Sequence, residues 1–441
     1  MYVAVDDTDS VKGNCTTFLA TAIIDEFADL DLIGYPRLVR LNPAVPWKTR
    51  GNGALTMRFG KGIGEKILIG NIGGRDIHCY EACSAWEPDA RAMLKRIIPL
   101  VEANSEPDAD PGVVVSETKP SQGFYWKGVR TILDREAAEN EIERIGAIRF
   151  EMGNGRGLVG SVCAMSWRPR DRTYELLTYR PRERWGTVRV YDPSTIREAE
   201  HTIATSFNSW DEGSSKVAMV PSTPCPVMYG FRGDVPEDLM KGFRLIRTEP
   251  VERWMIFLTN QGTDDHLLGN DVPFAPNSSY ILGGTVASAA RYLEGGHVLI
   301  DIDTGHGPVT CAAYEPSKEF RQLLVGLRIG DEVTVMGEYR DEPRTLNLEK
   351  VHVRSLVEDI KKVSNPVCAV CGRTMGSHGK GKGFRCRRCG TRSDSPITET
   401  VPRDLAVGWY EPPAYSRRHL SKPLCRMGEV QPVCFVNQRK R

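Results

Sequence analysis

The first third of the chain alternates short apolar runs with amphipathic segments, which is the pattern of an α/β fold. Residues 2–5 predict a strand, and residues 16–30 predict an amphipathic helix after an acidic turn. Further patterns predict a helix at residues 89–101 and strands at residues 36–41, 54–59 and 112–115. This alternation predicts an α/β domain over residues 1–125.

A second region with helical and strand patterns follows. Residues 133–145 and 194–206 predict helices, and residues 148–152 and 159–166 predict strands. This order is compatible with a ferredoxin-like domain over residues 126–250. Three glycines in this region match the spacing of a dinucleotide-binding loop, but the apolar run after them predicts a strand. We therefore interpret them as a hairpin turn, formed around Gly155, Gly157 and Gly160.

Five β-rich runs separated by glycine-containing turns dominate residues 275–355. They cover residues 280–286, 297–303, 309–314, 332–339 and 345–352, with a short helix-like insert at residues 320–327. Five strands and one helix favour an OB-fold β-barrel, a scaffold that often holds oligonucleotides. A small barrel without a ligand is the alternative interpretation.

The distribution of charge adds what the hydrophobic pattern does not show. The 441 residues carry a net charge of +1, yet residues 361–441 hold 17 Lys and Arg against 5 Asp and Glu. This tail therefore carries a net charge of +12, and the residues before it carry −11. A basic tail on an acidic body is expected of a nucleic-acid-binding segment attached to a separate unit.

The composition also excludes some classes of protein. With 40% apolar and 26% charged residues the chain is typical of a globular protein, and it holds no apolar run long enough for a membrane helix. The first residues lack the cationic and apolar pattern of a signal peptide. We therefore expect a cytoplasmic protein that does not enter membranes. Its 12 cysteines are expected to be thiols, metal ligands or nucleophiles rather than disulfides.

Four cysteines form the most specific motif of the sequence. Cys368 and Cys371 are separated by two residues, as are Cys386 and Cys389, and a glycine follows each pair. This spacing lets four thiolates surround one zinc ion in tetrahedral geometry. We predict a structural zinc ribbon with a basic tail over residues 364–441. The cations beside the cysteines favour RNA phosphates as a partner, and a purely structural ribbon is the alternative.

An acidic turn follows the first predicted strand and consists of Asp6, Asp7, Thr8, Asp9 and Ser10. Three carboxylates this close repel one another unless a divalent ion such as magnesium lies between them. Strand ends in α/β folds are common positions for such ligands. The start of the next helix, near Gly13, Thr16 and Thr17, could hold phosphate on its amides. We predict a magnesium and ATP site here, with a solvated turn or helix cap as the alternative.

Residues 46–53 combine an aromatic side chain, two cations and a permissive turn, and this segment could contact a nucleotide. Its polar members are Lys48, Arg50 and Asn52, and an ordinary surface loop is the alternative.

Two other motifs are interpreted as structural. Cys79 and Cys83, on a predicted helix or loop, lack a second pair, and residues 60–66 lack the spacing of a P-loop.

The acidic turn, Gly13 and the sequence Cys15-Thr16-Thr17 resemble the archaeal agmatidine synthetases, the tRNA-isoleucine 2-agmatinylcytidine synthetase family. The resemblance extends to residues 47–52 and 149–160 and to the order of the barrel and the ribbon, so it covers almost the entire chain. It implies a multidomain α+β protein with a kinase-like ATP-binding catalytic domain over residues 1–125. The ferredoxin-like domain, the OB fold and the zinc ribbon would follow.

The resemblance also implies an activity. The family conjugates agmatine to C2 of the wobble cytidine of AUA-decoding isoleucine tRNA, and ATP first phosphorylates the cytosine 2-oxygen that the amine displaces. This implies catalytic roles for Asp6, Asp7 and Asp9 and an autophosphorylated threonine at Thr16, with Thr17 as the alternative position. Residues expected to bind ATP with its magnesium are Thr8, Ser10, Gly13, Thr17, Lys48, Arg50 and Asn52. No protein partner is implied.

Two other functions fit the residues. A non-catalytic tRNA-binding or single-strand RNA-binding protein would need only the barrel and the ribbon. Another ATP-dependent RNA-modifying ligase would share the ATP site and differ in the amine.

Overall fold

The computed structural model describes residues 1–86, 88–379 and 381–428, and its largest element is one 11-stranded sheet. The strand order is β12-β9-β13-β5-β6-β2-β4-β1-β7-β8, and β3 pairs with β13 and β4. These strands are β1 (Tyr2–Asp6), β2 (Asp31–Ile33), β3 (Arg37–Arg40), β4 (Gly53–Gly60), β5 (Gly62–Ile72), β6 (Arg75–Cys83), β7 (Gly112–Ser116), β8 (Ile148–Glu151), β9 (Thr173–Tyr179), β12 (Val227–Gly233) and β13 (Arg253–Thr259).

The sheet unites the first two predicted domains. Strand β8, from the second region, pairs with β7 of the first. Strand β9, also from the second region, pairs with β13, which follows residue 250 and pairs in turn with β5 and β3 of the first. The limit predicted after residue 125 falls inside α3 (Gln122–Arg130), whose buried side chains pack against residues of β1, β3 and β4. The two regions therefore share one sheet, and their kinase-like and ferredoxin-like folds remain predictions.

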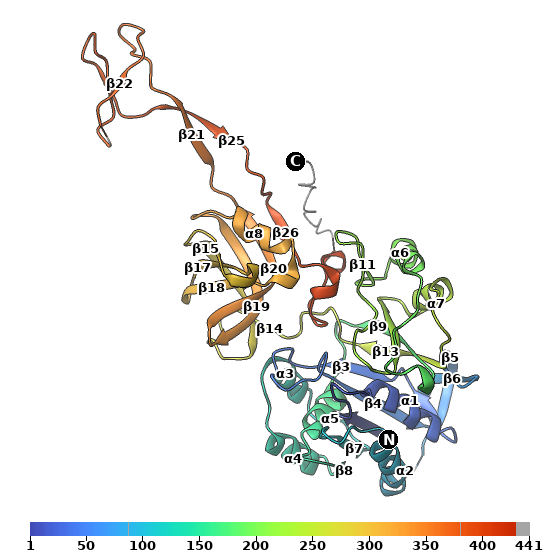
Figure 1. The fold of residues 1–441 in the computed structure, drawn as a ribbon. Coiled ribbons are helices and arrows are strands. Elements are labelled where there is room, and N and C mark those ends of the chain that lie inside the picture. The colour runs from blue at the N-terminus through green and yellow to red at the C-terminus, as the bar shows by residue number, and fades with distance from the viewer. Residues whose placement is uncertain (87, 380, 429–441) are drawn as a thin grey trace.

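Helices cover both faces of this sheet (Figure 1). Along β1, Val3 and Val5 pack toward α1 (Thr16–Glu26) and α2 (Ala90–Ala103), while Ala4 packs toward the opposite face. That opposite face carries α3, α4 (Arg135–Arg144) and α5 (Gly157–Ser166). Helices α6 (Pro193–Thr202) and α7 (Pro236–Leu245) pack on β9, β12 and β13. The alternation along β1 is that of a strand buried on both sides.

The prediction of a strand at residues 159–166, with a hairpin turn before it, is wrong. These residues lie in α5, which follows β8 and the turn at Gly155. The side chains of α5 are almost all buried, because α5 lies between the sheet and helices α3 and α4. A helix buried on all sides has a continuous apolar run, and periodicity cannot distinguish such a run from a buried strand.

Strands β5 and β6 form a long hairpin that the sequence patterns did not predict. Gly73 and Gly74 join them, and both have positive φ, as a two-residue hairpin turn of type I′ requires. The prediction of a helix or loop at Cys79 and Cys83 is wrong, because both residues lie on β6. Cys79 packs into the core of the sheet, as a structural thiol does. Residues 60–66 lie where β4 turns into β5, so they form part of the sheet.

A closed five-stranded barrel follows, as predicted for residues 275–355. Its strands are β15 (Ser278–Val286), β17 (Val298–Thr304), β18 (Gly307–Ala313), β19 (Glu332–Asp341) and β20 (Arg344–Ser355). Strand β15 closes the barrel by pairing with both β17 and β19, and β18 pairs with β20 in parallel. Helix α8 (Phe320–Gly326) lies between β18 and β19 in the chain and packs into the barrel core. This strand order is compatible with the predicted OB fold.

Several short elements complete the fold. They are β10 (Trp210–Asp211), β11 (Lys216–Val217), β14 (Leu267–Leu268), β16 (Arg291–Tyr292), β22 (Gly376–Ser377), β23 (Phe384–Arg385), β24 (Arg392–Ser393) and the 3-10 turns η1 (Arg182–Arg184), η2 (Glu294–Gly296), η3 (Glu315–Ser317), η4 (Ala414–Ser416) and η5 (Leu424–Arg426). Within the described ranges, no helix is long and apolar enough to cross a membrane.

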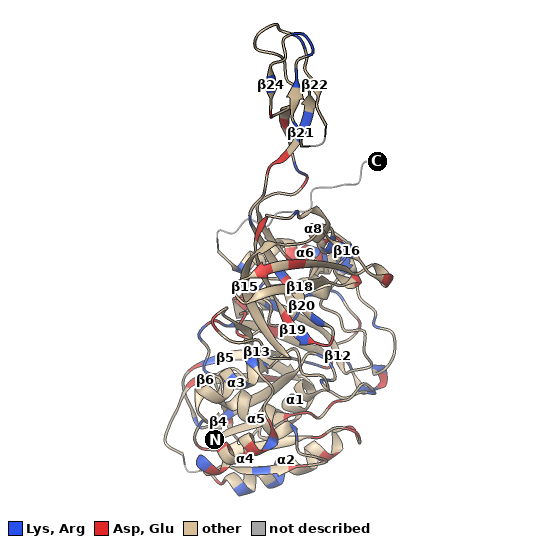
Figure 2. Ribbon diagram, turned by 90° about the vertical axis from the view of Figure 1, so that its left-hand side faces the viewer, with Lys and Arg blue, Asp and Glu red and all other residues tan. Residues whose placement is uncertain are grey.

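The ribbon extends away from the body on a two-stranded arm, β21 (Asp359–Ser364) and β25 (Ile397–Val401) (Figure 1). Lys and Arg residues lie along this arm and ribbon (Figure 2). After the arm, β26 (Gly408–Tyr410) pairs with β20, which returns the chain to the barrel. Residues 411–427, here called the C-terminal strap, then run back to the large sheet, where Leu420 joins the core beside α5.

Candidate functional site

A cavity of about 150 Å³ lies at the end of β1, between α1, α5 and the loop before β4. It brings together most of the residues predicted from the two separate motifs. Its lining includes the predicted residues Asp6, Asp7, Asp9, Thr16, Thr17, Lys48, Arg50 and Asn52. The acidic turn and residues 46–53 therefore form one site, as a nucleotide pocket would require.

Three predicted residues lie outside the lining. Thr8 is fully buried, and its hydroxyl donates to Thr16 Oγ1 at 3.1 Å, so it supports Thr16 from behind. Ser10 and Gly13 pair with each other across a tight turn, and the Ser10 hydroxyl accepts from the amide of Lys12. These two residues shape the turn that precedes α1.

The three carboxylates of the acidic turn are all largely buried. Burial, followed by the neighbouring Asp7 carboxylate, raises the pKa of Asp6 well above its usual value. Burial also raises the pKa of Asp7 and of Asp9, although Arg156 and Arg50 oppose it. Negative charge in this pocket is therefore costly, and a bound cation would offset that cost.

Thr16 lies at the first position of α1 and faces the acidic turn. Its hydroxyl donates to Asp9 Oδ1 at 3.3 Å while accepting from Thr8. The side chain is almost completely buried, yet it lines the cavity. The carboxylate of Asp9 is thus positioned to accept the proton of the Thr16 hydroxyl.

Arg156 is a site residue that the sequence analysis did not identify. Its Nε donates to Asp7 Oδ2 at 3.2 Å, and its Nη2 donates to Asp110 Oδ2 at 3.0 Å. The guanidinium also lies over the ring of Trp47, 5.6 Å from its centroid. Arg156 lies in the 149–160 segment of the family resemblance, which was the available signal.

The first turns of α5 lie against the acidic turn. A Cβ on Gly160 would be 1.7 Å from Asp6 Oδ2, so only glycine lets the carboxylate lie this close to the helix. The amide of Gly157 donates to Asp110 O at 2.9 Å, which fixes the start of the helix. The start of α5 is thus fixed directly against the Asp6 side chain.

Residues 47–53 are held to the acidic turn by Arg50. Its guanidinium forms an ion pair with Asp9 and donates to Asn14 O at 2.9 Å. Thr49 donates to the backbone oxygen of Asp9 at 3.3 Å, and Asn52 donates to Asn42 O at 2.9 Å. The Lys48 ammonium donates to the backbone oxygen of Pro43. Lys48 is exposed and forms no ion pair among the described residues, whereas Arg50 is paired with Asp9. Lys48 therefore has more freedom than Arg50 to reach a phosphate.

A closed ring of contacts connects this loop to the C-terminal strap. Arg40 Nη1 donates to Gly51 O at 2.5 Å, and Arg40 Nη2 pairs with the buried Glu175 at 3.6 Å. Gln261 donates to Glu175 at 2.5 Å, and His419 Nδ1 donates to Gln261 Oε1 at 2.7 Å. The His419 imidazole completes the ring by packing directly against Gly51. The space between them is so small that a Cβ added to Gly51 would lie 2.4 Å from the imidazole. The strap therefore braces the loop that carries Arg50.

The oxygens of this pocket suit magnesium chemically, but they do not converge on one point. In the described part of the chain, the four ribbon cysteines are the one group of three or more ligands that lie within 4.8 Å of one another. Asp7 and Asp9 each face an arginine, whereas Asp6 forms no ion pair among the described residues. The donor set fits a hard cation that is bound by carboxylates and by substrate phosphates together.

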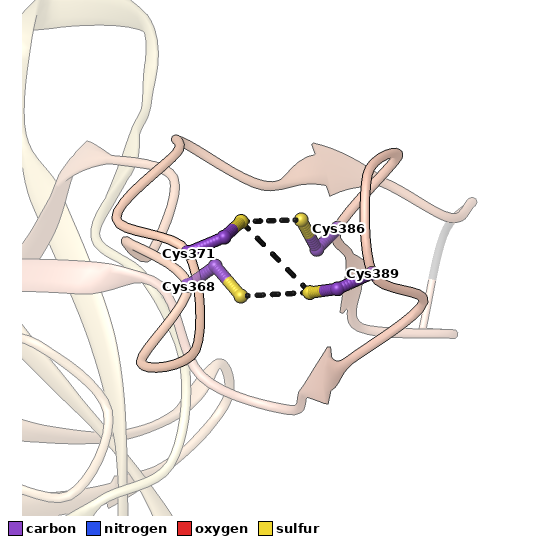
Figure 3. A group of neighbouring side chains, drawn as sticks. All are labelled: Cys368, Cys371, Cys386 and Cys389. Atoms are coloured by element: carbon purple, nitrogen blue, oxygen red, sulfur yellow. Dashed lines mark hydrogen bonds between the residues drawn. The ribbon is translucent and has the colours of Figure 1, made fainter.

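The four predicted zinc ligands do converge (Figure 3). The Sγ atoms of Cys368 and Cys389 are 3.3 Å apart, and those of Cys371 and Cys386 are 3.4 Å apart. Tetrahedral zinc with bonds of about 2.3 Å needs sulfurs about 3.8 Å apart, so the group fits the ion. Gly372 and Gly390 adopt positive φ and donate to the carbonyls of Cys368 and Cys386, which forms the two predicted knuckles.

Models of a known family match three parts of the chain. The matches are described as the TiaS TCKD domain at residues 2–154, the TiaS FLD domain at residues 155–266 and the TiaS C-terminal zinc ribbon domain at residues 365–405. The first two matched parts meet in the loop before α5.

Similar proteins cover nearly the whole chain. The tRNA-isoleucine 2-agmatinylcytidine synthetase TiaS of Archaeoglobus fulgidus is 38% identical, covering 97% of both chains, and that of Methanocaldococcus jannaschii is 35% identical, covering 96% of this chain and 98% of the relative. A crystal structure of TiaS in complex with its isoleucine tRNA and ATP is similar with a TM-score of 0.83, 37% identity and 98% of each chain covered. A complex of TiaS with the same tRNA, AMPCPP and agmatine has a TM-score of 0.81 and 34% identity, also with 98% of each chain covered. The chain therefore belongs to the tRNA-isoleucine 2-agmatinylcytidine synthetase family.

Proposed function

We propose that this protein is an ATP-dependent ligase that joins agmatine to C2 of the wobble cytidine of AUA-decoding isoleucine tRNA. The observation that carries the proposal is the cavity at the end of β1, where the carboxylates and Thr16 meet the cations of residues 47–53. Relatives of the same length and fold, crystallised with isoleucine tRNA, ATP and agmatine, support the same substrates. A non-catalytic RNA-binding protein has no use for such a pocket.

The chemistry needs the cytosine 2-oxygen to become a leaving group. A phosphoryl group of ATP is transferred to that oxygen and the rest of the nucleotide is released; the phosphorylated oxygen leaves C2 as phosphate once the amine has added. The primary amine of agmatine attacks C2, forms the new C–N bond and loses a proton. The side chains of Lys48 and Arg50 are the cations that would bind the ATP phosphates. Magnesium, when bound by Asp6 and Asp7, would offset charge on the transferred phosphoryl group.

The other modules would hold the tRNA. We propose that the first region is the kinase-like domain, the second the ferredoxin-like domain and the barrel an OB fold. The wobble base must leave its stack to enter this pocket, as in other base-modifying enzymes. The barrel and the basic ribbon would bind the tRNA outside the anticodon. Because its substrate is a tRNA, we propose a cytoplasmic enzyme.

The proposed function is tested by incubating the purified, zinc-loaded protein with ATP, radiolabelled agmatine and an isoleucine tRNA transcript. We expect the label to enter the anticodon, and only when ATP is present. A transcript with uridine at the wobble position is the matched control. A folded, zinc-loaded protein that incorporates no label would contradict the proposal.

We also propose that Thr16 becomes phosphorylated during the reaction. Its hydroxyl lies in the cavity and donates to Asp9, which could accept the proton as the oxygen attacks ATP. Thr16→Val should lose the phosphate that mass spectrometry detects after incubation with ATP, whereas Thr16→Ser should keep it. Thr17→Val is the control, because Thr17 also lines the cavity but contacts Cys15. Loss in the Thr17 variant alone would show that the modified threonine was misassigned.

A further inference from the structure

Four cations gather around Tyr2, at the start of β1, and around the adjoining end of α5, and none of the functions above uses them. They are Arg37, Arg58, Lys119 and Arg168, here called the Tyr2 cluster. The Arg58 guanidinium lies 5.4 Å and the Lys119 ammonium 5.2 Å from the centroid of the Tyr2 ring. The Arg37 guanidinium lies 5.9 Å from the centroid of Trp167, at the end of α5. An aromatic platform therefore carries a concentrated positive charge.

Two of these cations are held rigidly by backbone oxygens. Arg37 Nη1 donates to Trp167 O at 2.9 Å. Arg168 donates to Ser166 O at 2.9 Å and to Pro120 O at 3.1 Å. Both arginines therefore bind carbonyl groups at the C-terminal end of α5, where cations are favoured. Neither Arg58 nor Lys119 has such a partner among the described residues, so helix capping does not account for them.

The cluster has no internal counter-charge. Within the described ranges, none of its four cations lies within 4.0 Å of a carboxylate oxygen, whereas the three arginines that line the pocket, Arg40, Arg50 and Arg156, are all paired. Burial, then Arg37, Arg168 and Arg58, lower the pKa of Lys119 to about 7. These cations repel one another, and an anion bound among them would relieve the repulsion.

The position of the cluster relates it to the candidate active site. Tyr2 and Asp6 are four residues apart on β1, so their side chains point to the same face of the sheet. At about 3.3 Å per residue they are separated by about 13 Å along the strand. Helix α5 spans the two sites, with Gly160 beside Asp6 and Trp167 beside Arg37. A nucleic acid with one base in the cavity has neighbouring phosphates at distances of this order.

We propose that the Tyr2 cluster binds backbone phosphates of the substrate tRNA, outside the nucleotide that enters the cavity. The proposal rests on the proposed function, because it takes tRNA as the polyanion. Two guanidinium groups fixed by backbone carbonyls and two freer cations suit a phosphodiester chain, which accepts contacts from several directions. The cluster adds a third anchor to those of the barrel and the ribbon, and it is the one nearest the chemistry.

The test is a double charge reversal, Arg58→Glu with Lys119→Glu, measured as tRNA affinity over a range of salt concentrations. The matched control is Arg91→Glu with Lys95→Glu, two exposed cations on α2, on the other face of the sheet. We expect the Tyr2-cluster variant to bind tRNA at least about tenfold more weakly. The slope of log affinity against log salt should fall by about 0.7–0.9 for each phosphate that the variant no longer neutralises. The α2 variant should keep the slope of the unmodified protein.

Three further measurements make the result decisive. ATP affinity should be unchanged, and agmatine incorporation at saturating tRNA should stay within about twofold, because only the KM for tRNA depends on this cluster. The neutral pair Arg58→Gln with Lys119→Gln should show a smaller loss of affinity and keeps the test valid if the reversal disturbs folding. Equal tRNA affinities and slopes for the cluster and α2 variants would overturn the proposal. An unmodified protein that binds tRNA but incorporates no agmatine would instead contradict the proposed function.

Discussion

Asp7→Asn is expected to reduce agmatine incorporation by about 100-fold to 1,000-fold or more while leaving the fold intact. Asp7 lines the cavity and lies where charge would develop during phosphoryl transfer, and such groups have effects of this size. The asparagine keeps the shape but loses the negative charge that magnesium needs. Asparagine also tolerates the positive φ of 57° at this position, which alanine would adopt only with strain. Label incorporation and the melting temperature are measured together.

The matched control is Asp108→Asn. Asp108 pairs with Lys12 at 3.2 Å on the surface, close to the acidic turn in space, but it does not line the cavity. This exchange should leave incorporation within about twofold, because an exposed ion pair contributes little. In the Asp7 variant, Arg156 keeps its second partner Asp110, so the loop should stay folded. Activity of the Asp7 variant near that of the control would remove Asp7 from the chemistry.

Cys386→Ser is expected to release zinc, unfold the ribbon and weaken tRNA binding by about tenfold or more. The ribbon core consists of Cys368, Met375, Phe384 and Cys386 with Cys371 packed against it, which is too small to fold without the metal. The basic side chains of the ribbon would then lose their fixed positions. ATP affinity should not change, because the cavity lies at the end of β1 and no residue of the ribbon lines it. Metal content, tRNA affinity and ATP affinity are the three measurements.

Cys425→Ser serves as the control, since Cys425 is an exposed thiol of the C-terminal strap and is not a zinc ligand. Its metal content and both affinities should match those of the unmodified protein. If Cys386→Ser abolished ATP binding, the division between a chemical site at β1 and an RNA-binding arm would be wrong. If it released zinc without changing tRNA affinity, the ribbon would be purely structural.

The sequence predicted elements best where one face of a strand is exposed and turns are marked by glycine. The five barrel strands and α8 were predicted within a few residues for this reason. Helix α5 was missed because its surroundings bury it completely, which removes the 3.6-residue periodicity. Strand β5 was missed for the opposite reason, since most of its first half is exposed and offers little apolar pattern.

The candidate site was predictable as two motifs but not as one cavity. The acidic turn and residues 46–53 each suggested a nucleotide, yet only the pairing of β1 with β4 brings them together. Arg156 reaches Asp7 from a position 149 residues later in the chain, and no local pattern encodes that distance. The zinc site was the exception, because the spacing of its four cysteines is enough to predict that they bind one ion.

The position of the C-terminal strap, after the ribbon in the chain, determines which deletions and truncations the protein could tolerate. The ribbon lies between β20 and β26, and its entry and exit strands β21 and β25 are paired, so it is an insertion that could be exchanged or lost as a unit. His419, by contrast, follows the ribbon in the chain and braces the loop that carries Arg50. A premature stop codon directly after residue 410 would keep every strand of the large sheet and of the barrel, and the ribbon, but would remove this brace together with Leu420. A nascent chain would likewise acquire its tRNA-binding modules before its active site was complete.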